Sequence, residues 1–326
     1  MSERVYETFS ISLGPYCNAS CPFCITQMTM SPEMRESLKT EKIDLENFEI
    51  AKFIARNSNI ENIIFTGRGE PTLYSHMITE FLENLQDYGS PLPKGKPVID
   101  LQTNGLLFHN KEFKKEGHLE KWHDLGLRVV AVSIVDVINE KNQKIYTPKR
   151  EYPPLEETVE LLHNHGYSVR LSVTMIKGGI DSPEGIDRLY NYSQKYGIEQ
   201  TSVRPVRMPS STYNEKVTKW VKENKLDERF WKNQLRKIVR YISKEGTPLF
   251  RFSHGAVIYD WHGQNICLTD CLTLPKGEKV RQLIFYPNGQ ISYDWQYPGA
   301  VIIGPGKSYR KNESRRNSNN PKQDKA

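Results

Sequence analysis

The 326-residue sequence has few cysteines, five in all, and three of them lie within eight positions of one another near the start. No apolar run approaches the roughly 20 residues that a membrane-spanning helix needs. The N-terminus, MSERVYETFS, has neither the basic nor the apolar region of a secretory signal. These absences predict a cytoplasmic protein with no membrane partner. In that reducing compartment, a tight cysteine group indicates metal binding more often than disulfides.

Positive charge is concentrated at the C-terminal end. The net charge is +6, and residues 306–326 contain seven Lys/Arg and two Asp/Glu, so they contribute 7 − 2 = +5 of it. The rest of the chain is therefore nearly neutral. The low hydrophobicity of 306–326 predicts a disordered basic tail, with contact to nucleic acid or an acidic substrate as the alternative.

Apolar, β-rich segments alternate with amphipathic segments over most of the chain. We expect strands over residues 6–13, 60–67, 97–105, 127–136, 167–176 and 199–208. We expect helices over 44–58, 75–88, 119–126, 154–166, 183–197 and 227–246. Asp44 is the expected N-cap of the first helix, and Gly126 and Gly166 are expected at helix C-termini. Six β–α units predict a barrel or an open parallel sheet, with functional residues at the carboxyl ends of the strands.

The pattern changes after residue 246. Residues 247–305 contain short β runs punctuated by glycine and proline, among them RQLIFYPNGQISYDW. Its Pro287-Asn288-Gly289 predicts the turn of a hairpin. We therefore expect a barrel over 1–246, a small β-rich module over 247–305 packed on that barrel, and a disordered tail over 306–326.

The cysteine group lies in GPYCNASCPFC, residues 14–24, directly after the first expected strand. Cys17, Cys21 and Cys24 leave a four-coordinate zinc one ligand short. The next histidine is His76, and no fourth cysteine occurs before Cys267. A [4Fe–4S] cluster usually takes four cysteines, so three would leave one iron open to a small molecule. The residues alone favour a cluster over zinc and leave both possible.

The C-x3-C-x2-C spacing, with Phe23 before the third cysteine, resembles the signature of the radical S-adenosylmethionine (SAM) superfamily. In that family the open iron binds SAM, and one electron cleaves it to methionine and a 5′-deoxyadenosyl radical that abstracts hydrogen from a substrate. The resemblance implies Cys17, Cys21 and Cys24 as catalytic cluster ligands. It also implies a [4Fe–4S] cluster and SAM as cofactors, and a one-electron reductant such as flavodoxin or ferredoxin as a partner.

The segment TGRGEPTL, residues 66–73, is similar to the family's Gly-Gly-Glu-Pro motif, which receives the methionine ammonium group. Gly67 and Gly69 allow close approach of the backbone, and Glu70 offers a carboxylate. Arg68 interrupts the glycine pair, and we expect it to point outward or to contact an anion. An ordinary strand-to-helix turn is the alternative interpretation.

Polar side chains also end the later expected strands. They are Thr103, Asn104, Ser133, Ser172, Thr174, Arg204 and Arg207. By the same resemblance, the first three lie where related enzymes bind the carboxylate and ribose of SAM, and the next two lie near the adenine. The two arginines are candidates for a phosphate or carboxylate, since a guanidinium suits both. Each side chain could instead cap a helix or satisfy a turn.

The order of motifs over residues 8–209 most resembles the branch that contains molybdenum-cofactor biosynthesis protein A, which cyclises GTP. That enzyme has a second three-cysteine cluster in its C-terminal part, where this chain has only Cys267 and Cys271. A complete auxiliary cluster held only by cysteine is therefore excluded. The further ligands that an auxiliary metal could take are His254, His262 and Asp270. Inert or redox-paired thiols and a catalytic cysteine are the alternatives.

We therefore expect an α/β fold, a partial (β/α)6 TIM-like barrel with a small C-terminal β-rich module. The expected function is a radical SAM enzyme that acts on a nucleotide or nucleic-acid base. A peptide-modifying radical SAM enzyme is the alternative within this class. Outside it, the alternatives are a zinc- or cluster-bearing nucleic-acid-binding protein without catalysis and a catalytically dead relative with a structural cluster.

Overall fold

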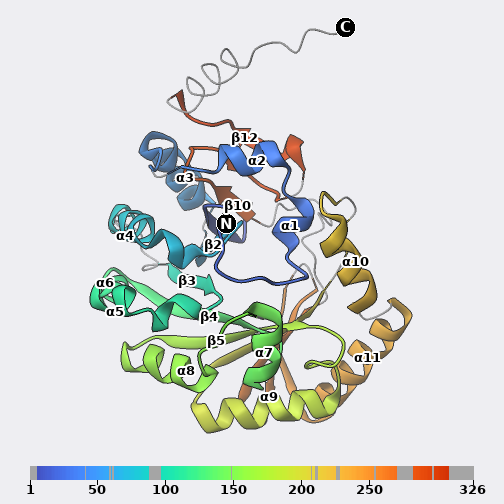
Figure 1. The fold of residues 1–326 in the computed structure, drawn as a ribbon. Helices are drawn as coiled ribbons and strands as arrows, with labels where there is room; N and C mark the ends of the chain where they lie inside the picture. Colours follow the sequence, from blue (N-terminus) through green and yellow to red (C-terminus); the bar gives the residue numbers. More distant parts are fainter. Residues whose placement is uncertain are drawn as a thin grey trace, which may run out of the picture.

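The fold is taken from a computed structural model and is drawn in Figure 1. It describes residues 6–307 apart from 41, 59, 61, 88–96, 148, 207, 210–211, 225–227, 253–254, 270–281 and 296. The predicted basic tail from residue 308 onward lies outside the described residues, as do Arg207, His254, Asp270 and Cys271.

The strands are β1 Thr8–Leu13, β2 Asn62–Gly67, β3 Val98–Thr103, β4 Leu127–Ile134, β5 Ser168–Met175, β6 Gln200–Pro205, β7 Thr247–Arg251, β8 Val257–Trp261, β9 Gln264–Leu268, β10 Gln282–Phe285, β11 Ile291–Ser292 and β12 Val301–Ile303. The helices are α1 Ile25–Thr29, α2 Pro32–Ser37, α3 Leu45–Asn57, α4 Ser75–Asn84, α5 Lys111–Lys115, α6 His118–Asp124, α7 Asn139–Tyr146, α8 Leu155–Asn164, α9 Pro183–Tyr196, α10 Glu215–Asn224 and α11 Glu228–Glu245. Short 3₁₀ helices cover Pro71–Tyr74, Leu106–His109 and Pro298–Ala300.

Each of the six expected strands and six expected helices is present, with ends that differ by a few residues. Asp44 caps α3 by accepting a 3.0 Å hydrogen bond from the Asn47 N–H. Gly126 and Gly166 have φ values of 104° and 82°, as expected where a helix ends. The expectation missed α1, α2, α5, α7 and α10. Of these, α7 buries only Asn142 and Tyr146, so it lacks the apolar stripe that marks a helix in a sequence.

All described strands belong to one sheet, in the order β12-β11-β10-β1-β2-β3-β4-β5-β6-β9-β8-β7. Strands β10, β1 to β6 and β9 run parallel, and the remaining pairs are antiparallel. The predicted hairpin forms between β10 and β11, with Gly289 at φ 86°. The α/β class with a TIM-like parallel core is therefore confirmed.

The C-terminal part is β-rich, as expected, but its described strands are arranged differently from the expectation. We expected residues 247–305 to pack on the barrel as a module, but β9 pairs with β6 and β10 pairs with β1. The described strands of this part therefore extend both edges of the barrel sheet. The physical reason is that an open barrel leaves unpaired N–H and C=O groups along its first and last strands, and added strands satisfy them. The division of the chain into domains remains a prediction.

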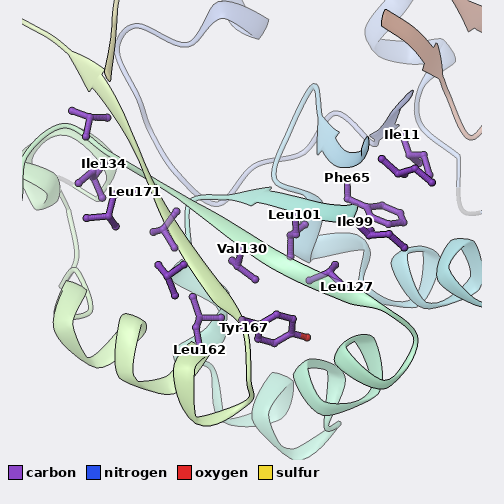
Figure 2. Close-up of a cluster of buried hydrophobic side chains, with 14 of the residues drawn as sticks. Ile11, Phe65, Ile99, Leu101, Leu127, Val130, Ile134, Leu162, Tyr167 and Leu171 are labelled. Atoms are coloured by element: carbon purple, nitrogen blue, oxygen red, sulfur yellow. The ribbon is translucent and has the colours of Figure 1, made fainter. Parts of the chain in front are cut away.

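The apolar core lies between the sheet and the surrounding helices. In Figure 1, helices α3, α4, α6, α8 and α9 lie along the outer side of the sheet, and the segment after β1 crosses its other side. Figure 2 shows buried core side chains from β1 to β5, together with Leu162 of α8 and Tyr167 just before β5. Because side chains alternate along a strand, the intervening residues point to the opposite side, which we call the inner face.

The inner face is polar. Its residues on β1 to β6 include Ser10, Ser12, Thr66, Asp100, Gln102, Ser133, Arg170, Ser172 and Ser202. On this face the Arg170 guanidinium, half-exposed on β5, reaches the fully buried carboxylate of Asp100 on β3. Thr66 approaches Gln102 at 3.4 Å. The sheet thus buries its apolar side under helices and presents hydrogen-bonding groups to the barrel interior. Among the described residues, no helix is both long enough and apolar enough to cross a membrane.

Phe48 of α3 tests the outer core. Its ring lies 4.8 Å from that of Phe81 and 5.0 Å from that of Phe285, measured between centroids, and it is fully buried. We expect Phe48→Ala to lower the free energy of unfolding by about 3–5 kcal/mol in urea denaturation. Phe53 on the same helix is 69% exposed, so Phe53→Ala should cost about 0.5 kcal/mol or less. Equal effects of the two changes would contradict the assigned helix face.

Candidate functional site

The cysteine loop lies at the carboxyl end of β1 and is held by backbone hydrogen bonds. The Tyr16 N–H donates to the Tyr74 hydroxyl at 3.0 Å, and the Tyr16 carbonyl accepts from the Glu70 N–H at 2.8 Å. On its far side, the Ser20 N–H donates to the Tyr146 carbonyl at 2.9 Å. Cys24 then occupies the N-cap position of α1. The loop is thereby fixed between the turn after β2 and the end of α7.

The three thiols of the loop lie within electrostatic reach of one another. Desolvation raises the pKa of Cys17 to about 11 and that of Cys21 well above its usual value, and neighbouring thiolates raise both pKa values further. Two donors oppose this shift at Cys17, the Ala19 N–H at 3.4 Å and the Asn104 amide at 3.8 Å from Sγ. Three thiolates can therefore coexist here only with a compensating positive charge.

That donor set fits an iron–sulfur cluster better than a single metal ion. Within the described part of the chain, no three His, Cys, Asp or Glu side chains are placed to hold one ion. Three thiols on one loop and two N–H groups directed at a sulfur match a cluster with one open iron, and the described residues place no fourth ligand beside them.

Gly69 makes the contact between the cysteine loop and the turn after β2 possible. A Cβ atom at this position would lie 2.0 Å from the carbonyl oxygen of Tyr16. At Gly67 the nearest atoms would be 3.4 Å away, which is ordinary contact. The close approach expected of this motif is thus present at Gly69, where the partner is the backbone of the cysteine loop itself.

Glu70 is buried at the centre of the site. Its Oε1 accepts hydrogen bonds from the Thr72 N–H at 3.1 Å, the Thr72 hydroxyl at 2.7 Å and the Thr103 hydroxyl at 2.5 Å. Its Oε2 accepts from the Asn104 N–H at 2.9 Å. Burial raises the pKa of Glu70, and these donors oppose the rise. The carboxylate joins the turn after β2 to the end of β3, and Oε2 retains capacity for a further donor.

Asn104 extends this network to the cysteine loop. Its side-chain amide donates to the Asn18 carboxamide oxygen at 2.7 Å and to Cys17 Sγ at 3.8 Å, and its Oδ1 accepts from the Leu106 N–H. Thr103 and Asn104 are 2% and 7% exposed. From the resemblance we expected both residues to contact SAM, and that contact stays a prediction. In the structure they hydrogen-bond Glu70 and the cysteine loop, so they also have a structural role.

Arg68 does not point outward, which corrects one of the two expectations for it. The residue is 5% exposed, and its guanidinium donates to the Thr29 hydroxyl at 3.3 Å and to the Trp295 carbonyl. It also lies 5.6 Å from the centre of the Trp295 ring. The inward direction follows from position, because Arg68 lies two residues after Thr66 and so continues the inner face of β2.

The expected nucleoside side of the site is a row of small polar residues. Ser133, Ser172 and Ser202 are register partners on β4, β5 and β6, and Cys267 on β9 continues the row. All four are half-buried. Thr174 and the exposed Arg204 are register partners two residues closer to the carboxyl ends of β5 and β6. The structure therefore brings Ser133, Ser172 and Arg204 to one end of the inner face.

Phe23 contacts aromatic residues that the sequence analysis missed. Its ring lies 6.5 Å from Tyr146 of α7 and 5.9 Å from Trp220 of α10, between centroids. Tyr152 lies in the same apolar cluster beside Cys21. The signal for α10 was available, because Val217, Trp220 and Val221 recur at helical spacing. His262, a candidate auxiliary ligand, lies in the β8–β9 turn with its Nε2 3.1 Å from a carboxylate oxygen of Glu245, and its role as a ligand stays a prediction.

Comparison with known proteins shows which family the sequence matches. The Radical SAM superfamily profile matches residues 11–193, more than half of the chain. The probable dual-specificity RNA methyltransferase RlmN of Chlorobium luteolum is 26% identical over 198 residues, covering 58% of this chain and 51% of that protein. The GTP 3′,8-cyclase of Aquifex aeolicus is 29% identical over 178 residues, covering 54% and 49%. The chain thus spans about half the length of these relatives.

A solved structure agrees in fold. Streptococcus suis SuiB bound to S-adenosylmethionine superimposes with a TM-score of 0.60 at 14% identity, covering 98% of this chain and 67% of that one. SuiB has also been solved with its precursor peptide SuiA, and that structure gives a TM-score of 0.59. The predicted resemblance is confirmed, and the relatives include both the GTP cyclase branch and a second, RNA-modifying branch.

Gly69 provides a test of the loop contact. We expect Gly69→Ala to lower the free energy of unfolding by about 1–3 kcal/mol, since the added methyl overlaps the Tyr16 carbonyl, and to reduce iron uptake on reconstitution. Gly299→Ala is the matched control, because a Cβ there meets nothing within 4 Å. Urea denaturation and iron analysis measure the two effects. Normal iron content in Gly69→Ala would show that the loop does not depend on this contact.

Glu70 provides a second test. Both of its oxygens accept from a backbone N–H, so either orientation of a glutamine would set its NH₂ group against a donor. We expect Glu70→Gln to cost about 1–3 kcal/mol of unfolding free energy. Glu120→Gln, at an exposed position on α6, should cost nothing measurable. Thermal and urea melts compare the two variants, and an unchanged stability of Glu70→Gln would refute the hydrogen-bond network.

Proposed function

The chain belongs to the radical SAM superfamily, and on that premise we propose that it is an enzyme that reductively cleaves SAM and abstracts hydrogen from a substrate. The observation that carries this proposal is the direct connection between the three-thiol loop and the GRGEP turn. The Glu70 N–H bonds the Tyr16 carbonyl, and Asn104 bonds both Glu70 and Cys17. Hydrogen bonds therefore join the proposed cluster-binding loop to the proposed SAM-binding turn.

The residues of this loop and turn fit the two cofactors. Cys17, Cys21 and Cys24 would hold a [4Fe–4S] cluster, and the backbone from Gly67 to Glu70 would receive the methionine end of SAM. When bound, the cluster and SAM supply a 5′-deoxyadenosyl radical generated by one electron from a reductant such as flavodoxin or ferredoxin.

The remaining site residues orient the cofactors and exclude water. The Ala19 and Asn104 donors orient Cys17 Sγ, and they stabilise its thiolate form. Phe23, packed against Tyr146 and Trp220, shields the side of the loop that carries Cys21. Exclusion of water from this region protects a reactive radical from side reactions.

The polar row on β4 to β6 is the proposed place of the nucleoside part of SAM. Ser133 and Ser172 are adjacent there, and hydroxyl groups suit a ribose. Arg204, at the end of the same side, supplies a cation for a phosphate or carboxylate.

A nucleotide or nucleic-acid base is the substrate class we propose. The supporting observations are the similarity to a GTP cyclase and to an RNA methyltransferase, together with the polar inner face. A peptide is the second candidate, and it is supported by the fold likeness to SuiB solved with its precursor peptide.

Anaerobic reconstitution with iron and sulfide tests the proposal. We expect about four irons per chain. With SAM and a strong reductant, we expect 5′-deoxyadenosine by mass spectrometry. Cys21→Ala should lose the chromophore and the product together. Cys267→Ala should keep the chromophore, because Cys267 lies on β9, outside the loop. Product formation by Cys21→Ala, or zinc in place of iron in the wild-type protein, would overturn the assignment.

A further inference from the structure

Several buried polar atoms on the inner face, Asp100 Oδ1 among them, have no hydrogen-bond partner within the described residues. Three of these atoms, Ser12 Oγ, Arg68 Nε and Tyr286 Oη, belong to groups that donate hydrogen bonds. Ser12 and Tyr286 are fully buried, and Arg68 is 5% exposed. Buried polar groups are normally paired, so each unpaired atom requires an explanation.

The three atoms come from neighbouring elements at the same end of the sheet. Ser12 is the register partner of Thr66, and Arg68 follows Thr66 by two residues. Tyr286 directly follows Phe285, whose register partner is Ile11, so Tyr286 comes level with Ser12.

Their side chains also share a direction. Ile11 and Phe285 lie in the core under the helices, whereas Tyr286 belongs to a separate cluster with Ile284 and Met30. Trp295 links the set, because its ring lies 6.0 Å from that of Tyr286 and 5.6 Å from the Arg68 guanidinium.

The charge at this place is unbalanced. The hydrogen-bond acceptors of Arg68 are the neutral Thr29 hydroxyl and Trp295 carbonyl, and Arg68 forms no ion pair with a carboxylate in the described part of the chain. Glu70, two residues away, directs its oxygens to Thr72, Thr103 and Asn104 instead. A buried guanidinium without an anion is costly, and a bound anion would remove that cost.

We propose that Arg68, Tyr286 and Ser12 form an oxyanion-binding site that takes a carboxylate or a phosphate group. All three groups donate hydrogen bonds, and guanidinium and hydroxyl donors suit both anions. The inference rests on the proposed function, because the anion is carried either by the methionine part of SAM or by the substrate. Ser12 and Tyr286 gain a role that the sequence motifs do not indicate.

The Tyr286→Phe variant removes the Tyr286 hydroxyl, which has no partner among the described residues, and so tests its role. Removing a phenol oxygen that has no partner leaves the unliganded protein as stable as before or more stable, whereas removing one that binds a structural water destabilises it. We therefore expect Tyr286→Phe to keep or raise the melting temperature of the unliganded protein. Tyr192→Phe is the matched control, since the Tyr192 hydroxyl on α9 is also buried without a partner among the described residues.

The binding experiment has two arms. In the first, SAM and decarboxylated SAM are titrated by anaerobic calorimetry into reconstituted wild-type protein, Arg68→Gln and Tyr286→Phe. In the second, inorganic phosphate and acetate are added at constant ionic strength, and the rise in melting temperature is measured on the protein as purified. Arg128→Gln, at the start of β4, controls for the loss of one arginine.

The outcomes separate the two sources of the anion. If the anion belongs to SAM, both variants weaken SAM binding about tenfold or more and leave decarboxylated SAM unaffected. If it belongs to the substrate, SAM binding is unchanged and stabilisation by phosphate or acetate is lost in both variants. No change in either arm, or a lower melting temperature of unliganded Tyr286→Phe, overturns the proposal. Neither arm requires SAM cleavage, so a failure of the proposed reaction is recognised separately.

Discussion

The buried carboxylate of Glu70 is the interaction on which the site depends. It accepts four hydrogen bonds from Thr72, Thr103 and Asn104, and its own N–H binds the Tyr16 carbonyl. One residue thereby fixes the turn after β2, the end of β3 and the start of the cysteine loop. Strand pairing brings the ends of β1, β2 and β3 side by side, and the bonds of Glu70 join the three segments at that edge.

The architecture around this carboxylate divides the sheet into two sides with different tasks. The outer side packs apolar residues against α3, α4, α6, α8 and α9 and provides stability, whereas the inner side carries hydroxyl, amide and guanidinium groups. The C-terminal strands pair with β1 and β6 and bring Trp295 and Tyr286 to the inner side. A polar interior with a buried arginine is suited to a charged ligand. In a purely structural barrel, the buried charge would lower stability without serving a function.

The sequence predicted what depends on local spacing. The cysteine loop, the GRGEP turn, the Asp44 cap and the six β–α units all follow from residues close together in the chain. It did not predict the pairing of β9 and β10 with the barrel edges, because strand pairing over such separations leaves no periodic mark. The contact between Arg68 and Trp295 could not be predicted for the same reason, since the two residues are 227 positions apart.

The most direct test of the account is electron–nuclear double resonance on the reduced, reconstituted protein with SAM labelled at its amino nitrogen and carboxylate oxygen. We expect hyperfine coupling of both labels to the cluster, because a cluster held by Cys17, Cys21 and Cys24 would leave one iron open to SAM. A cluster signal that is identical with and without SAM, and no coupling to either label, would contradict it.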